Sequence, residues 1–279
     1  MGGQFRMDVE NAFDLVNHPI TELDTPSGDT LVRQCKARLT THGAYVLEGF
    51  LRQEALATIL DELVGVLDNA FYKPKTHNAY LAPGDENFSA QHPRNREQLT
   101  DSATLAYDFI ARDSLLEQIY RWSPLRDFIA RTLGFEQLFP YADALAAANV
   151  LVYPPGTQTG WHFDNAHFVV TLMLRQAQRG GAYEYAPFIR APDEENYPAI
   201  ESILDGGRGS VQTLKQSAGD LVVFQGRYTL HRVTEVRGIE SRLIAVLSYD
   251  VKPGTTLTPH TRKTFYGRAH EADSLSGNG

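Results

Sequence analysis

Cysteine and long apolar runs are nearly absent from this sequence. Cys35 is the only cysteine in 279 residues, so neither an internal disulfide nor a zinc site built from several cysteines can form. No stretch approaches the roughly 20 apolar residues needed to cross a bilayer. The N-terminal MGGQFRMDVENAFDL also lacks the apolar segment of a secretion signal. We therefore expect a cytoplasmic protein with no membrane partner.

Positive charge is also in deficit. The 26 lysines and arginines face 34 aspartates and glutamates, which gives a net charge of −8 and an isoelectric point near 5.6. A protein that binds phosphate backbones usually carries the opposite balance, so we expect no nucleic-acid partner. Hydrophobic residues make up 42% of the chain and aromatic residues 10%, which is enough core material to exclude extended disorder.

The first 145 residues are predicted to be mainly helical, with one short buried strand at 44–50. Apolar residues recur at helical spacing in several segments, and glycine or proline stands where a helix would end or begin. We expect helices at 30–42, capped by Ser27 or Asp29 and ended by Gly43, and at 53–70, 104–112, 114–122 and 124–133.

The pattern changes near residue 146. Short runs rich in valine, leucine and aromatic residues are separated by glycine, proline and aspartate, which is typical of an antiparallel sandwich or barrel. We find no repeat and no low-complexity linker, so we expect one domain over 1–279. It would comprise a helical shell (1–145), a β core (146–250) and a closing segment (251–279), with a surface loop at 193–209. The runs are ANVLVY, HFVVTLML, GGAYEY, GDLVVF and SRLIAVLSY.

Four polar residues stand out in the β region. His162 and Asp164 are one residue apart, a spacing that places both side chains on the same face of a strand. Alone, this pair equally suits a buried histidine beside a carboxylate. His231 follows in a second strand, and two imidazoles with one carboxylate form the facial triad of non-haem Fe(II) oxygenases. Arg242 opens an apolar strand, where a guanidinium is costly unless a carboxylate meets it.

The order of these residues resembles the Fe(II)/2-oxoglutarate-dependent oxygenase superfamily. Its double-stranded β-helix, or jelly roll, carries His-x-Asp, a distal histidine and then an arginine. The segments TGWHFDNAHFVVTLML, GGAYEYAPFIR and HRVTEVRGIESRLIAVLSYD are also similar to bacterial enzymes that hydroxylate, or in a variant subgroup chlorinate, aliphatic carbons of free amino acids. The superfamily resemblance covers residues 146–250, and TFYGR extends the similarity to this group of enzymes to Arg268. It implies a jelly-roll core with a helical N-terminal shell.

The resemblance also implies cofactors and roles. Fe(II) would be held by the triad, and 2-oxoglutarate and dioxygen would take the remaining positions on the metal. Arg242 would bind the distal carboxylate of 2-oxoglutarate, helped by Tyr153 and Thr171, although both also suit an ordinary β core. Asp164 stands where the chlorinating subgroup has a small residue, which implies hydroxylation. The implied iron ligands, and catalytic residues, are His162, Asp164 and His231.

Five further residues are candidates for binding the substrate. Glu184 is expected either to meet a substrate ammonium group or to be a solvated strand residue. Arg94 and Arg96 lie in a polar loop of the kind that forms lids, where one would pair with a substrate carboxylate or both would be solvated. Phe265 and Tyr266 would line the pocket or simply pack the chain's end against the core.

The other histidines are not expected at the metal. His167 is predicted to face away from the triad, and Trp161 to lie in the core. No partner spacing marks the remaining histidines, so we expect them at the surface; they are His18, His42, His77, His92, His260 and His270.

Three functions stay open on the sequence alone. The first is hydroxylation of a small amino acid or a similar metabolite, and the second is desaturation or cyclisation of another small natural-product intermediate by the same cofactors. The third is a jelly roll that binds or senses a ligand without catalysis. In each case the partner is a small molecule, and neither its identity nor the oligomeric state follows from the residues.

Overall fold

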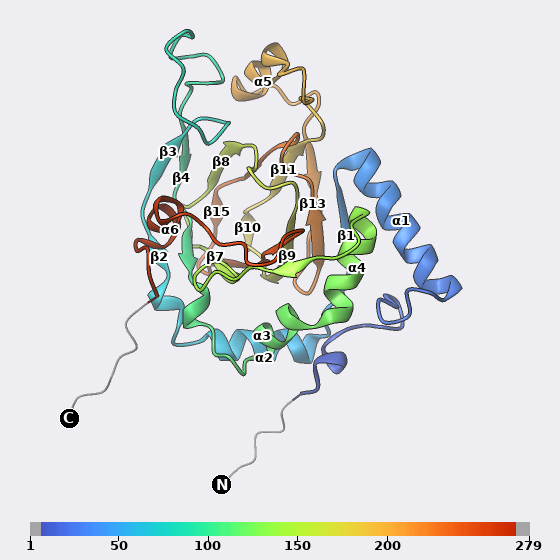
Figure 1. Cartoon of the computed structure of the whole chain (residues 1–279). Coiled ribbons are helices and arrows are strands. Elements are labelled where there is room, and N and C mark those ends of the chain that lie inside the picture. Colours follow the sequence, from blue (N-terminus) through green and yellow to red (C-terminus); the bar gives the residue numbers. More distant parts are fainter. Residues whose placement is uncertain (1–6, 272–279) are drawn as a thin grey trace, which may run out of the picture.

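The computed structural model describes residues 7–271, and most of its strands form two antiparallel sheets (Figure 1). The larger sheet contains, in spatial order, β1 (Ala44–Leu47), β13 (Leu221–Phe224), β9 (Val169–Arg175), β16 (Arg242–Leu247), β7 (Ala148–Tyr153), β5 (Ala103–Leu105) and β2 (Phe71–Tyr72). The smaller sheet contains β12 (Gln212–Leu214), β11 (Tyr183–Ala186), β14 (Leu230–Val233), β8 (Thr159–His162), β4 (Gln98–Thr100) and β3 (Lys75–His77). Two short pairs join β10 (Arg179–Gly180) to β15 (Val236–Arg237) and β6 (Phe139–Pro140) to β17 (Tyr249–Asp250).

Strands from the first half of the chain complete both sheets. The strands predicted at 148–153 and 44–50 form β7 and β1, while the unpredicted β2 and β5 also join the larger sheet and β3 and β4 join the smaller one. The helix predicted at 104–112 is wrong, because this segment forms the end of β5 and the 3-10 helix η3 (Tyr107–Phe109). Thr104 pairs with Leu151 of β7, and this sheet pairing overrides the local helical pattern.

Four of the five predicted helices exist, and two of them have clearly shifted bounds. α1 (Pro26–His42) begins earlier than predicted, and Thr25 rather than Ser27 or Asp29 caps it, by accepting from the N–H of Gly28. Gly43 ends this helix at φ 70°, as predicted. The helix predicted at 53–70 is shorter: α2 (Gln53–Leu63) is followed by the 3-10 helix η2 (Leu67–Asn69). α3 (Leu115–Arg121) and α4 (Ser123–Leu133) form where they were predicted.

Three further helical elements were not predicted. The 3-10 helix η1 (Val9–Ala12) precedes α1, and α5 (Tyr197–Leu204) occupies the predicted loop at 193–209, where its Ile200 and Ile203 are buried. α6 (Pro259–Tyr266) lies in the closing segment. Within residues 7–271, no helix combines the length and the apolar character needed to cross a membrane.

The larger sheet separates helices α1–α4 from an internal cavity. Alternate residues of a strand face opposite sides, so Val150 and Val152 of β7 join the core against α1–α4, whereas Asn149, Leu151 and Tyr153 line the cavity. β9 and β16 alternate in the same way. Figure 1 shows α2, α3 and α4 along the side of this sheet that faces away from the smaller one. One sheet face therefore supplies stability and the other supplies the lining.

Asp143 ties the closing segment to the start of β7. The residue is 1% exposed, and its carboxylate accepts from the N–H groups of Leu145, Ala146 and Leu257 and from the guanidinium of Arg262 in α6. Burial alone would raise the pKa of Asp143, but these donors outweigh it and lower the pKa below 3.8. Because α6 lines the cavity, this contact also shapes the site.

We predict that Asp143→Asn lowers the free energy of unfolding at pH 7 by about 3 kcal/mol, the usual cost of breaking a buried ion pair. A carboxylate with a lowered pKa contributes stability above its unfolded pKa and loses that contribution as pH falls through its folded pKa. The difference between wild type and variant should therefore shrink below about pH 4, as measured by urea unfolding. Asp24→Asn, which removes an exposed ion pair with Arg131, should stay near wild type; an equal loss in both variants would contradict the prediction.

Candidate metal centre and its cavity

The two histidines of the predicted triad lie directly opposite each other on neighbouring strands. His162 is the last residue of β8, His231 lies in β14, and the two are partners in the antiparallel ladder. Directly paired residues on antiparallel strands project to the same face of a sheet. Their rings approach to 4.1 Å between centroids, on the side that lines the cavity.

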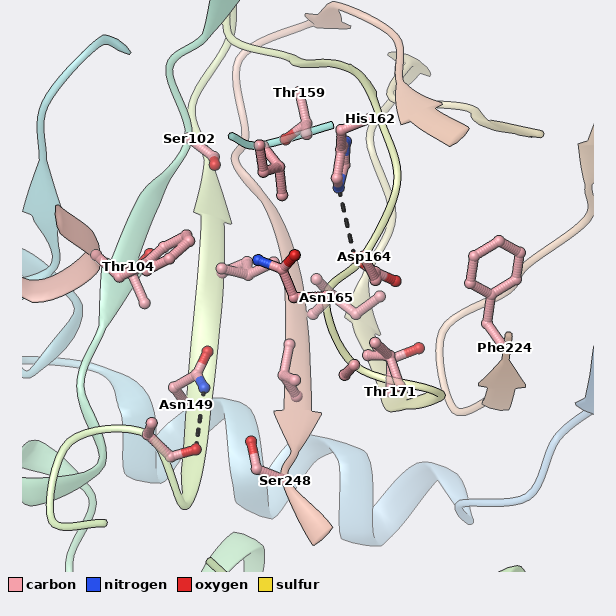
Figure 2. Close-up of a pocket in the computed structure, with 18 of the residues that line it drawn as sticks. Ser102, Thr104, Asn149, Thr159, His162, Asp164, Asn165, Thr171, Phe224 and Ser248 are labelled. Carbon is pink, nitrogen blue, oxygen red and sulfur yellow. Dashed lines mark hydrogen bonds and ion pairs between the residues drawn. The ribbon is translucent and has the colours of Figure 1, made fainter. Parts of the chain in front are cut away.

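Asp164 reaches the histidines from a turn. We expected His162 and Asp164 on one strand face, but β8 ends at His162, and Asp164 lies in the segment that leads to β9. The N–H of Asp164 donates to the carbonyl oxygen of Gly226 (3.1 Å), which holds the turn. Oδ1 of Asp164 lies 3.7 Å from Nε2 of His162, a pair drawn in Figure 2, and 3.5 Å from Nε2 of His231.

Backbone carbonyl groups orient both imidazole rings. Nδ1 of His162 donates to the carbonyl oxygen of Gly160 (2.8 Å), and Nδ1 of His231 donates to that of Thr229 (2.9 Å). A carbonyl oxygen only accepts, so the proton of each neutral ring lies on Nδ1. Nε2 of each ring then keeps its lone pair and points toward Asp164, which is the arrangement of metal-binding histidines.

The protonation states of His162 and Asp164 also favour binding of a cation. Burial, followed by the neighbouring His231, lowers the pKa of His162 to about 3. Burial alone would raise the pKa of Asp164, but the two imidazoles outweigh it and lower this pKa. At neutral pH His162 is therefore uncharged and Asp164 is ionised, so a metal ion has no proton to displace from either group.

These three residues fit a ferrous ion. Their ligating atoms all lie within 4.8 Å of one another. Two imidazoles and one carboxylate, with positions left for other ligands, are the donor set typical of non-haem Fe(II) enzymes. In the part of the chain that the structure describes, no other group of three histidine, cysteine or acidic residues meets the same condition.

The triad opens into a cavity of about 830 Å³ between the two sheets. Figure 2 shows His162 toward one end of this cavity and Asn149 and Ser248 toward the other. Five residues expected to bind the co-substrate or the substrate line it, namely Arg242, Tyr153, Thr171, Phe265 and Tyr266. A cavity of this size and mixed lining is typical of a site for a small molecule.

Arg242 lies in the cavity wall without a carboxylate partner. The residue is 1% exposed, it pairs with Tyr153 across β16 and β7, and its guanidinium lies 5.1 Å from the Tyr153 ring. Nη2 donates weakly to Oε1 of Gln216 (3.4 Å), and Nη1 has no hydrogen-bond partner. Burial lowers the pKa of Arg242. A buried guanidinium with an unpaired donor requires an anion, and the distal carboxylate of 2-oxoglutarate fits this requirement.

Tyr153 and Thr171 lie on the strands that flank Arg242. Tyr153 ends β7, and its hydroxyl shares a hydrogen bond with that of Thr159 (3.0 Å). Thr171 lies in β9 on the face that lines the cavity, opposite Val246 of β16. The structure therefore places both hydroxyl groups in the same cavity as Arg242.

Glu184, Arg94 and Arg96 are placed elsewhere. Tyr183 faces the cavity, so Glu184, the next residue of β11, faces away from it. Ion pairs and hydrogen bonds occupy all three charged groups, and none of these residues lines the cavity, so the substrate contacts expected of them are not supported. The partners are Arg208 and Arg232 for Glu184, Tyr197 and Glu195 for Arg94, and Asp205 for Arg96.

The loop that carries Arg94 and Arg96 packs against α5 and does not cover the triad. The guanidinium of Arg94 lies 4.5 Å from the Tyr80 ring, and Arg96 donates to the carbonyl oxygen of Leu204 (2.9 Å), the last residue of α5. These contacts give the two arginines a structural role. The sequence placed them in a loop, but the unpredicted helix α5 is what occupies them.

His77 was wrongly expected at the surface. It is part-buried in β3, lines the cavity, and meets the ring of His162 edge-on at 5.8 Å. Nε2 bonds to Oγ1 of Thr100 (2.7 Å), and burial lowers the pKa of His77. Its strand has only three residues, too few for a sequence pattern to reveal. His167 also lines the cavity but is exposed, whereas Trp161 is buried as predicted.

Comparisons with known proteins agree with this geometry. Residues 27–266 match a family model described as Halogenase D. No curated protein sequence matches the chain.

Three similar solved structures have low sequence identity, so they establish the fold alone. AviO1 from Streptomyces viridochromogenes Tue57 is 16% identical over 79% of this chain and 95% of that one, with a TM-score of 0.54. A 2OG-Fe(II) oxygenase family oxidoreductase from Burkholderia pseudomallei is 15% identical over 80% of this chain and 92% of that one, with a TM-score of 0.51. The alpha-ketoglutarate-dependent epimerase SnoN from nogalamycin biosynthesis is 14% identical over 79% of this chain and 81% of that one, with a TM-score of 0.53.

We predict that His162→Ala and His231→Ala each weaken Fe(II) binding roughly 100-fold or more, because each removes one of three ligands. The unliganded proteins should unfold near the wild-type temperature, since water fills the space left by the ring. Anaerobic calorimetric titration with Fe(II) measures the affinity. The exposed His42 provides a matched control, and wild-type affinity in either ligand variant would contradict the assignment.

Proposed function

The chain belongs to the Halogenase D family of the Fe(II)/2-oxoglutarate-dependent oxygenase superfamily, and on that premise we propose that it hydroxylates an aliphatic carbon of a small amino acid or a similar metabolite. The observation that carries this proposal is the carboxylate of Asp164 beside both imidazoles, at 3.5 and 3.7 Å. In the chlorinating subgroup that the sequence resembles, a small residue leaves that position to a halide. Asp164 therefore favours hydroxylation over halogenation.

His162, Asp164 and His231 would hold the iron, and Arg242 would hold 2-oxoglutarate. SnoN, which has the same fold, is described in complex with Fe3+ and alpha ketoglutarate. With 2-oxoglutarate and dioxygen, the bound iron supplies the oxidising power that replaces a C–H bond by C–OH. The protein contributes the positions: Nδ1 hydrogen bonds fix the two rings, and the Arg242 fork orients the co-substrate. Tyr153 and Thr171 would add hydroxyl donors to the same carboxylate.

The end of the cavity away from His162 suits a small polar substrate. Hydrogen-bonding side chains of Asn149 and Ser248 stand there among apolar residues (Figure 2), and Thr104 lines the same cavity. Such isolated polar groups orient a small molecule. Phe265 and Tyr266 of α6 would close one side, since both line the cavity.

Lys75 is well placed to meet a substrate carboxylate. It lines the cavity, and its ammonium group lies 3.8 Å from the centre of the Phe265 ring. No described residue forms an ion pair with it, in contrast to Arg94 and Arg96. Burial lowers the pKa of Lys75 to about 8. An unpaired, partly desolvated cation in the cavity would be stabilised by an anionic group on the substrate.

We also infer that the two facing sheets form a double-stranded β-helix and that the chain is one domain. The ladders within both sheets are antiparallel, and the cavity between them carries the triad. Strands β1 to β5 complete these sheets from the first half of the chain. The helical part therefore has no separate sheet of its own.

The fold alone does not choose among oxidative outcomes, because SnoN, described as an epimerase, shares it. Desaturation or cyclisation would use the same triad. A non-catalytic jelly roll is disfavoured, since the unpaired buried guanidinium of Arg242 and the buried His231 beside a carboxylate cost stability that packing alone does not return.

We predict succinate release with at least one free amino acid, together with a product heavier by one oxygen atom. Incubating the enzyme with Fe(II), 2-oxoglutarate and a panel of amino acids, followed by mass analysis, tests both points. Loss of two hydrogens would support the desaturase or cyclase alternative, and chloride incorporation would contradict the role given to Asp164. Absence of a metal-to-ligand charge-transfer band on anaerobic addition of Fe(II) and 2-oxoglutarate would favour the binding protein.

A second prediction concerns Lys75. Because kcat/KM reports groups of the free enzyme, its value should fall as pH rises through about 8, where Lys75 loses its charge. Lys75→Arg stays charged and should remove this fall, while Lys75→Met should raise KM roughly tenfold or more at pH 7 with a smaller change in kcat.

Lys36→Met, on the exposed face of α1, is the matched control for the lost charge. An unchanged KM in Lys75→Met, or the same alkaline fall in Lys75→Arg, would exclude Lys75 as the carboxylate anchor.

A further inference from the structure

Gly226 lies against the side chain of Asp164 with no room for a methyl group. A Cβ atom at Gly226 would lie 1.8 Å from Oδ2 of Asp164 and 2.5 Å from its Cγ. Both distances are below 3.0 Å, a separation below which Cβ contacts are essentially never found. Gly226 is not among the glycines with positive φ. Its need for glycine is therefore a need for space beside the carboxylate and not a backbone requirement.

The backbone around Gly226 is held on several sides. Its carbonyl oxygen accepts from the N–H of Asp164 (3.1 Å), and the N–H of Gln225 donates to the carbonyl oxygen of Gly43 (2.7 Å). On the other side, Nη2 of Arg190 donates to the carbonyl oxygen of Arg227 (2.7 Å). A larger residue at 226 would meet a fixed backbone, so the Asp164 carboxylate is the group that must move.

The two oxygens of Asp164 have different surroundings. Oδ1 faces Nε2 of His162 and of His231, at 3.7 and 3.5 Å, while Oδ2 is the atom nearest to the Cβ position of Gly226. Displacing Oδ2 rotates or withdraws the whole carboxylate. The oxygen that faces the imidazoles would then leave its place in the triad.

We propose that Gly226 is a positioning residue for the metal: its bare Cα forms the wall that holds Oδ2 and thereby keeps Oδ1 directed at the two imidazoles. The inference rests on the proposed function, because it takes His162, Asp164 and His231 as the iron ligands. Neighbours of a metal ligand that fix its orientation typically contribute about 10- to 100-fold to metal affinity.

Four proteins test the proposal by anaerobic calorimetric titration with Fe(II): wild type, Gly226→Ala, Asp164→Gly and the double variant. Gly226→Ala should bind Fe(II) about 10- to 100-fold more weakly than wild type. In the Asp164→Gly background the same methyl group should change nothing, because the three atoms nearest to it all belong to the Asp164 side chain. Gly209→Ala is the matched control, since no atom lies within 4 Å of its added Cβ.

The outcomes separate this inference from the proposed function. Absence of Fe(II) binding by wild type, or wild-type affinity in Asp164→Gly, would overturn the proposed function and with it the role of Gly226. If both of those tests are passed, wild-type affinity in Gly226→Ala, or an equal loss in both backgrounds, would overturn the positioning role alone. Should Gly226→Ala fail to fold, recovery of folding in the double variant supports the steric link to Asp164, and continued unfolding overturns it.

Discussion

The pairing of His162 with His231 across β8 and β14 is the constraint on which the site depends. Because the two residues are direct partners in an antiparallel ladder, their rings share one face of the smaller sheet without help from any loop. Hydrogen bonds from Nδ1 to Gly160 and Thr229 then direct both Nε2 atoms toward one point. Only the third residue of the triad, Asp164, requires the less regular backbone beyond the strand end, and the missing side chain of Gly226 leaves space for it there.

The two faces of the larger sheet have different roles: one packs against the helices and the other lines the cavity. Valine and leucine on one face pack against α1–α4, and burial of each such side chain contributes about 1.5–3 kcal/mol. The other face carries Arg242, which costs stability because it is buried without a carboxylate partner. The helical shell and the polar cavity are thus consequences of one strand alternation, and the packing on the first face offsets the cost of the second.

Much of the fold was predictable because apolar runs between turn residues indicate strands in the sequence. β7 coincides with its predicted segment, and α3 and α4 lie where helical spacing placed them. The misses have a common cause. The segment 104–112 has a helical pattern, but its first residues pair with β7. The helix α5 lies in a polar segment, but its Ile200 and Ile203 are buried against the rest of the protein. In both places tertiary contacts override local preference.

The sequence by itself determined the donor types and their order: two histidines, one aspartate and an arginine opening an apolar strand. These residues were visible without a structure because their types and their order along the chain are a property of the sequence, although the shared strand face expected for His162 and Asp164 was wrong. Only the tertiary structure decided which other charges are available. It pairs Glu184 with two arginines, leaves Lys75 unpaired in the cavity, and places His77 and Gly226 beside the triad. Those neighbours depend on the register between segments far apart in the chain, which no local pattern records.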